Sequence, residues 1–110
     1  MALFKKNRLS ARTEIQKTIR QGQNFFLNEI KVYFKKSDQE FLRAAIIVPK
    51  KIDKRAAIRN KLRRRAGEII RKIIPQTEKP GDMVILMQKG AEVLKFKELK
   101  EKLISVLENL

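Results

Sequence analysis

The most constraining feature of the sequence is an amphipathic segment that lies between two almost continuously apolar segments. In Ala56–Ile74, isoleucine, leucine and alanine recur at the i, i+3, i+4 spacing of a helix with one buried stripe. Phe41–Val48 and Asp82–Gln88 flank this segment, and their near-continuous apolarity is typical of strands that are covered on both faces. The order strand, helix, strand predicts two parallel strands in one sheet, with Phe41–Val48 as a central strand.

Three further elements complete the predicted fold. Ala11–Gln21 is predicted to be a helix with Ser10 as its N-cap and Gly22 just past its end. Phe25–Lys36 alternates apolar and polar residues like a strand with one wet face, and a bend within it is expected to split the strand. Apolar residues repeat at helical spacing from Phe96 to Leu110. The predicted fold class is an α/β (α+β) two-layer sandwich with a small mixed sheet, in the order α-β-β(-β)-α-β-α.

The length of the chain is that of one domain. Its 110 residues include 43% hydrophobic residues and no candidate linker, so residues 1–110 are predicted to fold around one core. Residues 1–9 carry several cations before any periodicity begins, which predicts a flexible basic arm. The sequence shows neither a membrane-spanning stretch nor the apolar core of a secretory signal, so we expect a cytoplasmic protein without a membrane partner.

The charge of the chain points to a polyanionic partner. Lys and Arg number 27 against 12 Asp and Glu, giving a net charge of +15. Eleven of these cations lie between Lys50 and Lys72, where only Asp53 and Glu68 are acidic. A helical projection separates most of them from the apolar stripe. Like charges at this spacing cost about 0.2–0.5 kcal/mol per pair, so the cationic face favours an anionic ligand over a merely solvated surface.

Two further observations indicate that the anion is a nucleic acid. Arginine dominates the cationic face, and a guanidinium grips phosphate in a bidentate fork and stacks on bases. The helix begins among cations at the end where its dipole favours bound phosphate. The chain has no His and no Cys, so we expect no self-contained catalysis, no catalytic residue and no metal ligand set.

At this point the residues resemble those of a known family. Lys50-Lys51, followed by Arg59-Asn60-Lys61-Leu62-Arg63-Arg64 and by Glu68, resembles the arginine-asparagine-arginine motif of the bacterial ribonuclease P protein subunit. RLSARTEIQKTIRQGQ resembles that family's first helix, and Gly81–Leu99 resembles its last strand and the entry to its last helix. The resemblance implies a left-handed crossover in the strand, helix, strand unit, which is an exception to the usual rule.

The resemblance also implies a function. The family's protein binds a large catalytic RNA, and the complex removes the 5′ leader of precursor tRNA by hydrolysis. Metal ions held mainly by the RNA perform the chemistry, so no cofactor is expected on the protein alone and Mg²⁺ is expected in the RNA-containing holoenzyme. The implied partners are the catalytic RNA and precursor tRNA, and no protein partner is implied.

Two sets of site residues follow from the resemblance. The first set matches the family's RNA-facing motif or lies beside it on the basic helix: Lys50, Lys51, Arg55, Arg59, Asn60, Lys61, Arg63, Arg64 and Arg65. The second set is expected to contact the single-stranded leader between the first helix and the sheet: Arg12, Ile15, Ile19, Lys31, Tyr33 and Arg43.

The chain departs from the family pattern at several positions. Lys61 replaces the motif's second arginine, and Gly67 stands where an arginine commonly precedes the glutamate. Ile15 and Ile19 stand where phenylalanines are frequent, so either leader contact or core packing explains them. Phe25–Phe26 is interpreted as core or bend rather than as a stacking surface.

Two other functions remain as alternatives. A structural RNA-binding protein of the ribosomal type would use the same basic helix without any turnover. A DNA-compacting protein is disfavoured because the cations concentrate on one helix of a mixed pattern and no dimerisation heptad is visible.

Overall fold

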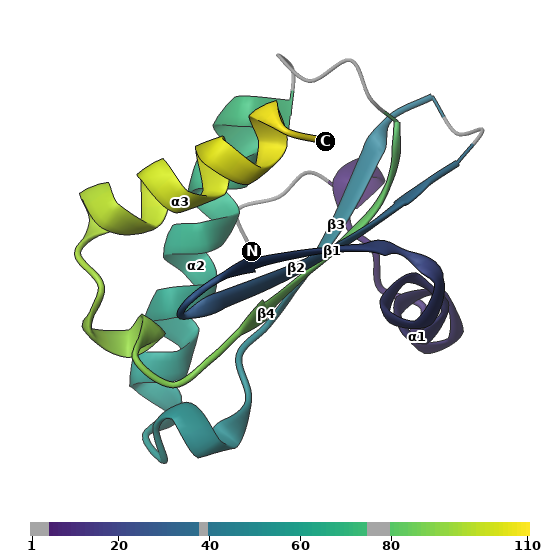
Figure 1. The fold of residues 1–110 in the computed structure, drawn as a ribbon. Coiled ribbons are helices and arrows are strands. Elements are labelled where there is room, and N and C mark those ends of the chain that lie inside the picture. Colours follow the sequence, from purple (N-terminus) through teal and green to yellow (C-terminus); the bar gives the residue numbers. More distant parts are fainter. Residues whose placement is uncertain (1–4, 38–39, 75–79) are drawn as a thin grey trace.

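The computed structural model describes residues 5–37, 40–74 and 80–110. One mixed sheet has the strand order β1-β2-β4-β3. Helices α2 and α3 cover one face of this sheet, and α1 lies on the other face (Figure 1). The arrangement confirms the predicted fold class and element order. The elements, in chain order, are α1 Arg12–Gln21, β1 Gln23–Leu27, β2 Ile30–Lys36, β3 Leu42–Ile47, α2 Ala56–Ile73, β4 Gly81–Met87 and α3 Phe96–Glu108.

The predicted strand, helix, strand unit is present, but its first strand lies at an edge of the sheet. β3 pairs in parallel with β4 and has no other strand beside it, whereas β2 and β4 occupy the centre. The prediction that Phe41–Val48 is a central strand is therefore wrong. Continuous apolarity indicates that both faces of a strand are covered. It does not indicate the position of that strand in the order of hydrogen-bonded strands. The hand of the crossover stays an expectation drawn from the family resemblance.

The outer edge of β3 is covered by the N-terminal segment. The Leu9 amide donates to the Ala44 carbonyl at 2.9 Å, and the Asn7 side-chain amide donates to the Leu42 carbonyl at 2.9 Å. Leu9 is only 3% exposed. The prediction of a flexible arm is therefore wrong for Lys5–Leu9, because an apolar residue and backbone pairing hold this segment on an edge that would otherwise be open. The first four residues lie outside the described part.

The expected bend in the first strand is a hairpin. β1 and β2 are antiparallel, with Leu27 opposite Ile30, so only Asn28 and Glu29 form the turn. Asn28 has a φ of 52°, a left-handed conformation that asparagine tolerates better than most residues. The predicted split of the strand is confirmed.

α1 ends at Gln21 as predicted, but its N-cap and the conformation of Gly22 differ from the prediction. Ala11, not Ser10, is the N-cap, and it makes no side-chain capping hydrogen bond. Gly22 follows the helix in an extended conformation, with its amide bonded to the Thr18 carbonyl. A Cβ at Gly22 would lie 2.5 Å from the Thr18 oxygen and 2.8 Å from the Phe34 oxygen. Glycine is needed here because two backbone segments approach closely, and not for a left-handed cap.

Two apolar clusters lie on opposite faces of the sheet. The larger cluster fills the space between the sheet and helices α2 and α3, and includes Ile70, Met83 and Leu103, each at most 1% exposed. The smaller cluster lies on the α1 face and contains Leu9, Tyr33, Ala45 and Val84, with Ile15 and Ile19 packed against it. Within the described residues, no helix has the length and apolarity needed to cross a lipid bilayer.

Candidate RNA-binding surfaces

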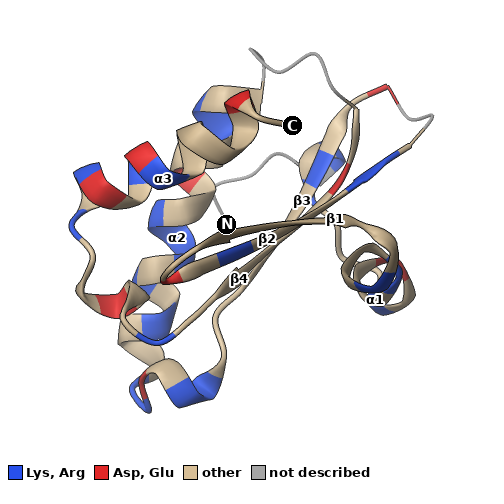
Figure 2. Ribbon diagram, viewed as in Figure 1, with Lys and Arg blue, Asp and Glu red and all other residues tan. Residues whose placement is uncertain are grey.

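The first candidate surface is the cationic stretch Lys50–Arg65, which we call the basic surface. It begins with the short 3-10 helix Lys50–Ile52 and continues through the first half of α2. Figure 2 shows Lys and Arg along α2 and around the loop that leads into it. The first set of predicted residues lies on this stretch, half-buried at Arg59, Arg63 and Arg65 and exposed at Lys50, Lys51, Arg55, Asn60, Lys61 and Arg64.

Hydrogen bonds from two arginines brace the loop that enters α2. Arg55 donates to the Asp53 carboxylate from its backbone amide and from its guanidinium, at 2.9–3.0 Å. The side-chain hydrogen bond from Arg55 is the largest cause that lowers the pKa of Asp53, to about 2, so this carboxyl is ionised at neutral pH. One nitrogen of Arg59 donates to the carbonyls of Asp53 and Lys54, at 2.8 and 3.0 Å. Arg59 therefore has a structural task in the loop beside any contact with RNA.

Most of the positive charge on the basic surface has no counter-ion in the part of the chain that the structure describes. Among the described residues, Arg55 is the one cation of Lys50–Arg65 that forms an ion pair. Arg63 donates to the Asn60 side-chain oxygen at 2.8 Å, so Asn60 orients a neighbouring guanidinium. The first turn of α2 has no acidic residue, and the side chain of its N-cap, Arg55, makes no capping hydrogen bond to the helix. Cations at the positive end of the α2 helix dipole favour a bound anion there.

The second candidate surface is the α1 face of the sheet. Tyr33 is only 9% exposed, because it packs in the smaller apolar cluster beneath α1. Ile15 and Ile19 are half-buried against the same cluster, so core packing accounts for both. Arg12 is exposed at the first turn of α1, and Lys31 is half-buried on β2. The structure therefore places these predicted leader residues on one face, but it leaves little of the Tyr33 ring open to a base.

Arg43 has a different task from the predicted one. Its guanidinium donates to both carboxylate oxygens of Asp82, at 2.9 and 3.0 Å, and also to the carboxylate of Glu14 on α1. The hydrogen bond to Asp82 raises the pKa of Arg43 further above its ordinary value. The prediction of Arg43 as a leader contact is revised, because two carboxylates accept hydrogen bonds from its Nε and Nη2 and the triad fastens α1 to the sheet.

We expect Arg43→Met to destabilise the protein by about 2 kcal/mol or more, because Asp82, only 7% exposed, would keep a buried charge without its partner. Urea unfolding followed by circular dichroism measures the change. The double variant Arg43→Met/Asp82→Leu is the control, and it should recover most of the loss. A double variant that is no more stable than Arg43→Met would contradict this role of the pair.

One exposed aromatic residue on this face was missed from the sequence. Phe26 is 64% exposed, and the Lys31 ammonium lies 5.6 Å from the centroid of its ring. Phe25 pairs with Val32 and packs on the larger cluster, so alternation turns Phe26 to the α1 face. Of the interpretation as core or bend residues, core is therefore correct for Phe25, whereas Phe26 is an exposed strand residue and neither core nor bend. Side chains alternate between the two faces of a strand with a period of two residues, and this alternation is the sequence signal that places Phe26 opposite to Phe25.

A comparison with family models identifies the chain. The model described as Ribonuclease P matches residues 3–110. The chain belongs to the ribonuclease P protein family. Among curated ribonuclease P protein components, that of Bacillus velezensis is 32% identical over 103 residues, covering 90% of this chain and 84% of that protein. That of Dictyoglomus turgidum is 29% identical over 106 residues, covering 94% and 88%.

Solved structures of ribonuclease P proteins share the fold. The protein from Thermotoga maritima, solved in complex with 1-(4-fluorophenyl)-2-thiourea, superposes with a TM-score of 0.86 at 27% identity, covering 94% of this chain and 99% of that one. A Staphylococcus aureus ribonuclease P protein gives 0.83 at 21% identity and covers 94% of both chains, which supports the fold alone. Sequence and fold thus agree on the family of this chain.

Proposed function

We propose that the chain binds the catalytic RNA of ribonuclease P through the basic surface and the 5′ leader of precursor tRNA through the α1 face of the sheet. In this role it assists endonucleolytic removal of the leader to give the mature tRNA 5′ end. The protein supplies binding and positioning, and it contributes no catalytic residue. Metal chemistry belongs to the holoenzyme, in which Mg²⁺ is held mainly by RNA.

The observation that carries the proposal is the uncompensated charge of the basic surface. Like-charged neighbours on α2 destabilise the free protein, and phosphates remove that cost when they bind. Arginine forks suit phosphate oxygens, and the uncapped first turn of α2 adds backbone amides with the same preference. Lys61 keeps the charge of the motif but contributes a point contact instead of a fork.

The opposite side of the same helix explains why these cations stay together. Leu62, Ala66, Ile69 and Ile70 of α2 are at most 6% exposed and pack in the larger cluster. Because α2 is fixed along this stripe, its outward residues are presented as one rigid array. A folded RNA with fixed phosphate positions suits such an array better than a flexible polyanion does.

Reconstitution tests the proposal directly. The protein, mixed with a bacterial ribonuclease P RNA, should increase cleavage of a precursor tRNA at low magnesium concentration, where phosphate repulsion limits the RNA alone. The rate of leader release is measured by gel electrophoresis of end-labelled substrate. Bovine serum albumin at equal concentration controls for non-specific effects. If the rate equals that of the RNA alone across protein concentrations, the proposal fails.

A further inference from the structure

The α1 face of the sheet is built from cross-strand rows of side chains, and α1 covers only some of them. One row joins Tyr33 to Val84 and Ala45, all at most 9% exposed. A second row joins Asp82 to Arg43, and Arg43 also donates a hydrogen bond to Glu14 of α1. Both rows lie in contact with α1 or with residues packed under it, so they belong to the protein interior.

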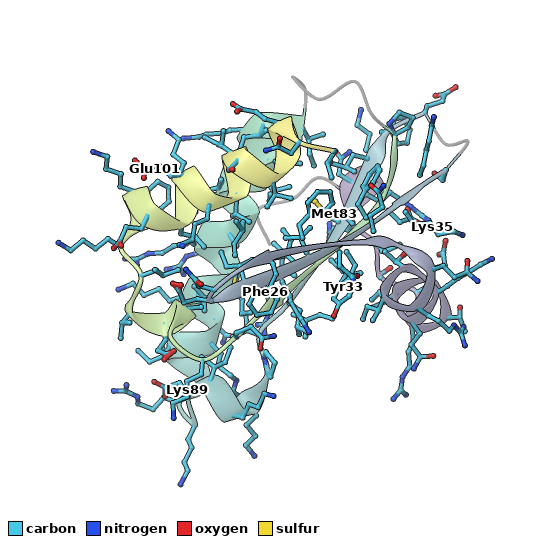
Figure 3. The ribbon with its side chains drawn as sticks, in the orientation of Figure 1. Phe26, Tyr33, Lys35, Met83, Lys89 and Glu101 are labelled. Atoms are coloured by element: carbon cyan, nitrogen blue, oxygen red, sulfur yellow. The ribbon has the colours of Figure 1, made fainter. Side chains whose placement is uncertain are left out.

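A third row is only partly covered, because Leu86 and Ile47 pack against the smaller cluster whereas Phe26 is exposed. Across the four strands it runs Phe26, Lys31, Leu86, Ile47, following the pairs Phe26–Lys31, Lys31–Leu86 and Ile47–Leu86. Phe26 is exposed and the other three side chains are half-buried. We call these four residues the open row. Figure 3 labels Phe26 and Tyr33 on one side of the sheet and Met83 on the other.

The chemistry of the open row suits an unpaired nucleotide. Phe26 offers a broad aromatic surface, 64% exposed, on which any base can stack. The Lys31 ammonium lies over the Phe26 ring, 5.6 Å from its centroid, so a cation is available beside a nucleotide that displaces it from that ring face. Leu86 and Ile47 continue the apolar floor on the next two strands. This combination of aromatic ring, cation and apolar floor is typical of surfaces that bind single-stranded nucleic acid.

The position of the open row connects it to the basic surface. Ile47 is the last residue of β3, and Lys50 and Lys51 follow it after only two residues. A single strand lying across the row toward β3 therefore runs onto exposed cations. An RNA strand satisfies both parts of this path, because its bases match the open row and its phosphates match the lysines.

We propose that Phe26 is the residue on which a base of the precursor tRNA leader stacks, with Lys31 as its phosphate contact. This inference rests on the proposed function. It assigns the stacking contact with the leader to Phe26 on β1 instead of to Tyr33, which is covered. Ile15 and Ile19 offer no aromatic ring, so the open row supplies the π surface that α1 lacks.

The test uses the holoenzyme reconstituted with a bacterial ribonuclease P RNA and two ligands, a precursor tRNA with an unpaired leader and the same tRNA with a mature 5′ end. Phe26→Leu should weaken binding of the precursor about 5- to 150-fold, which corresponds to one base stack of about 1–3 kcal/mol. Binding of the mature tRNA should not change. Phe26→Tyr should retain binding of the precursor, because the aromatic face remains. Lys31→Gln should weaken binding of the precursor and reduce its salt dependence.

Phe96→Leu is the matched control, because Phe96 is an exposed phenylalanine on α3 and lies outside the open row. Precursor binding by Phe26→Leu that equals the wild type, or an equal loss for both tRNAs, overturns the assignment of Phe26. The proposed function fails separately, if the wild-type holoenzyme itself does not prefer the precursor over the mature tRNA.

Discussion

Arg63→Ala/Arg64→Ala is expected to weaken binding of ribonuclease P RNA by about 150-fold or more at physiological salt. Each hydrogen bond to a charged group contributes about 1.5–3 kcal/mol, and two such contacts are lost. Arg64 is exposed and Arg63 contacts Asn60, so neither side chain supports the core. Filter binding over a range of salt concentrations measures the change. The slope of log K against log salt should become shallower by about two.

Lys97→Ala/Lys100→Ala is the control for this prediction. It removes the same charge from exposed positions of α3, outside the basic surface. Only a small loss of affinity is expected from the reduced net charge. If both double variants lost affinity equally, the protein would bind RNA through its total charge and not through the basic surface.

Ile70→Ala is expected to lower the free energy of unfolding by about 2–5 kcal/mol. Ile70 is fully buried where α2 packs on the sheet, and its truncation leaves a cavity in the larger cluster. Such a loss is a large share of the roughly 5–15 kcal/mol that stabilises a typical domain. Urea unfolding followed by circular dichroism measures it.

Two measurements make this prediction specific. Ile70→Val should cost about 0.5–1.5 kcal/mol, because most of the side chain remains. At temperatures where Ile70→Ala is folded, its RNA affinity and salt slope should match the wild type. A shallower slope would contradict the separation of α2 into a packing face and an RNA-binding face.

The helical elements and the strand faces could be predicted from sequence because they depend on local periodicity. The buried stripe of α2 and its cations follow the spacing of a helix, so both were predicted correctly. Alternation along β1 also contained the outward direction of Phe26, but Phe25–Phe26 was interpreted without it.

Contacts between distant residues could not be predicted in this way. Arg43 meets Asp82 across 39 positions and Glu14 across 29, so no local pattern reveals that its charge is neutralised. Leu9 similarly lies on β3 through a pairing that local apolarity does not encode. Arg43 was interpreted as free to bind RNA, and Leu9 was interpreted as part of a flexible arm.

The sequence by itself determined the family, the amphipathic basic helix and the positive charge from which we expect a polyanionic partner. Tertiary structure alone decided that β3 is an edge strand, that Tyr33 lies under α1 and that Phe26 of the open row is exposed. The physical reason is that periodicity determines which side of an element is apolar, whereas exposure depends on which other element packs there. On the α1 face that element is a ten-residue helix, too short to cover all the rows of side chains that four strands present.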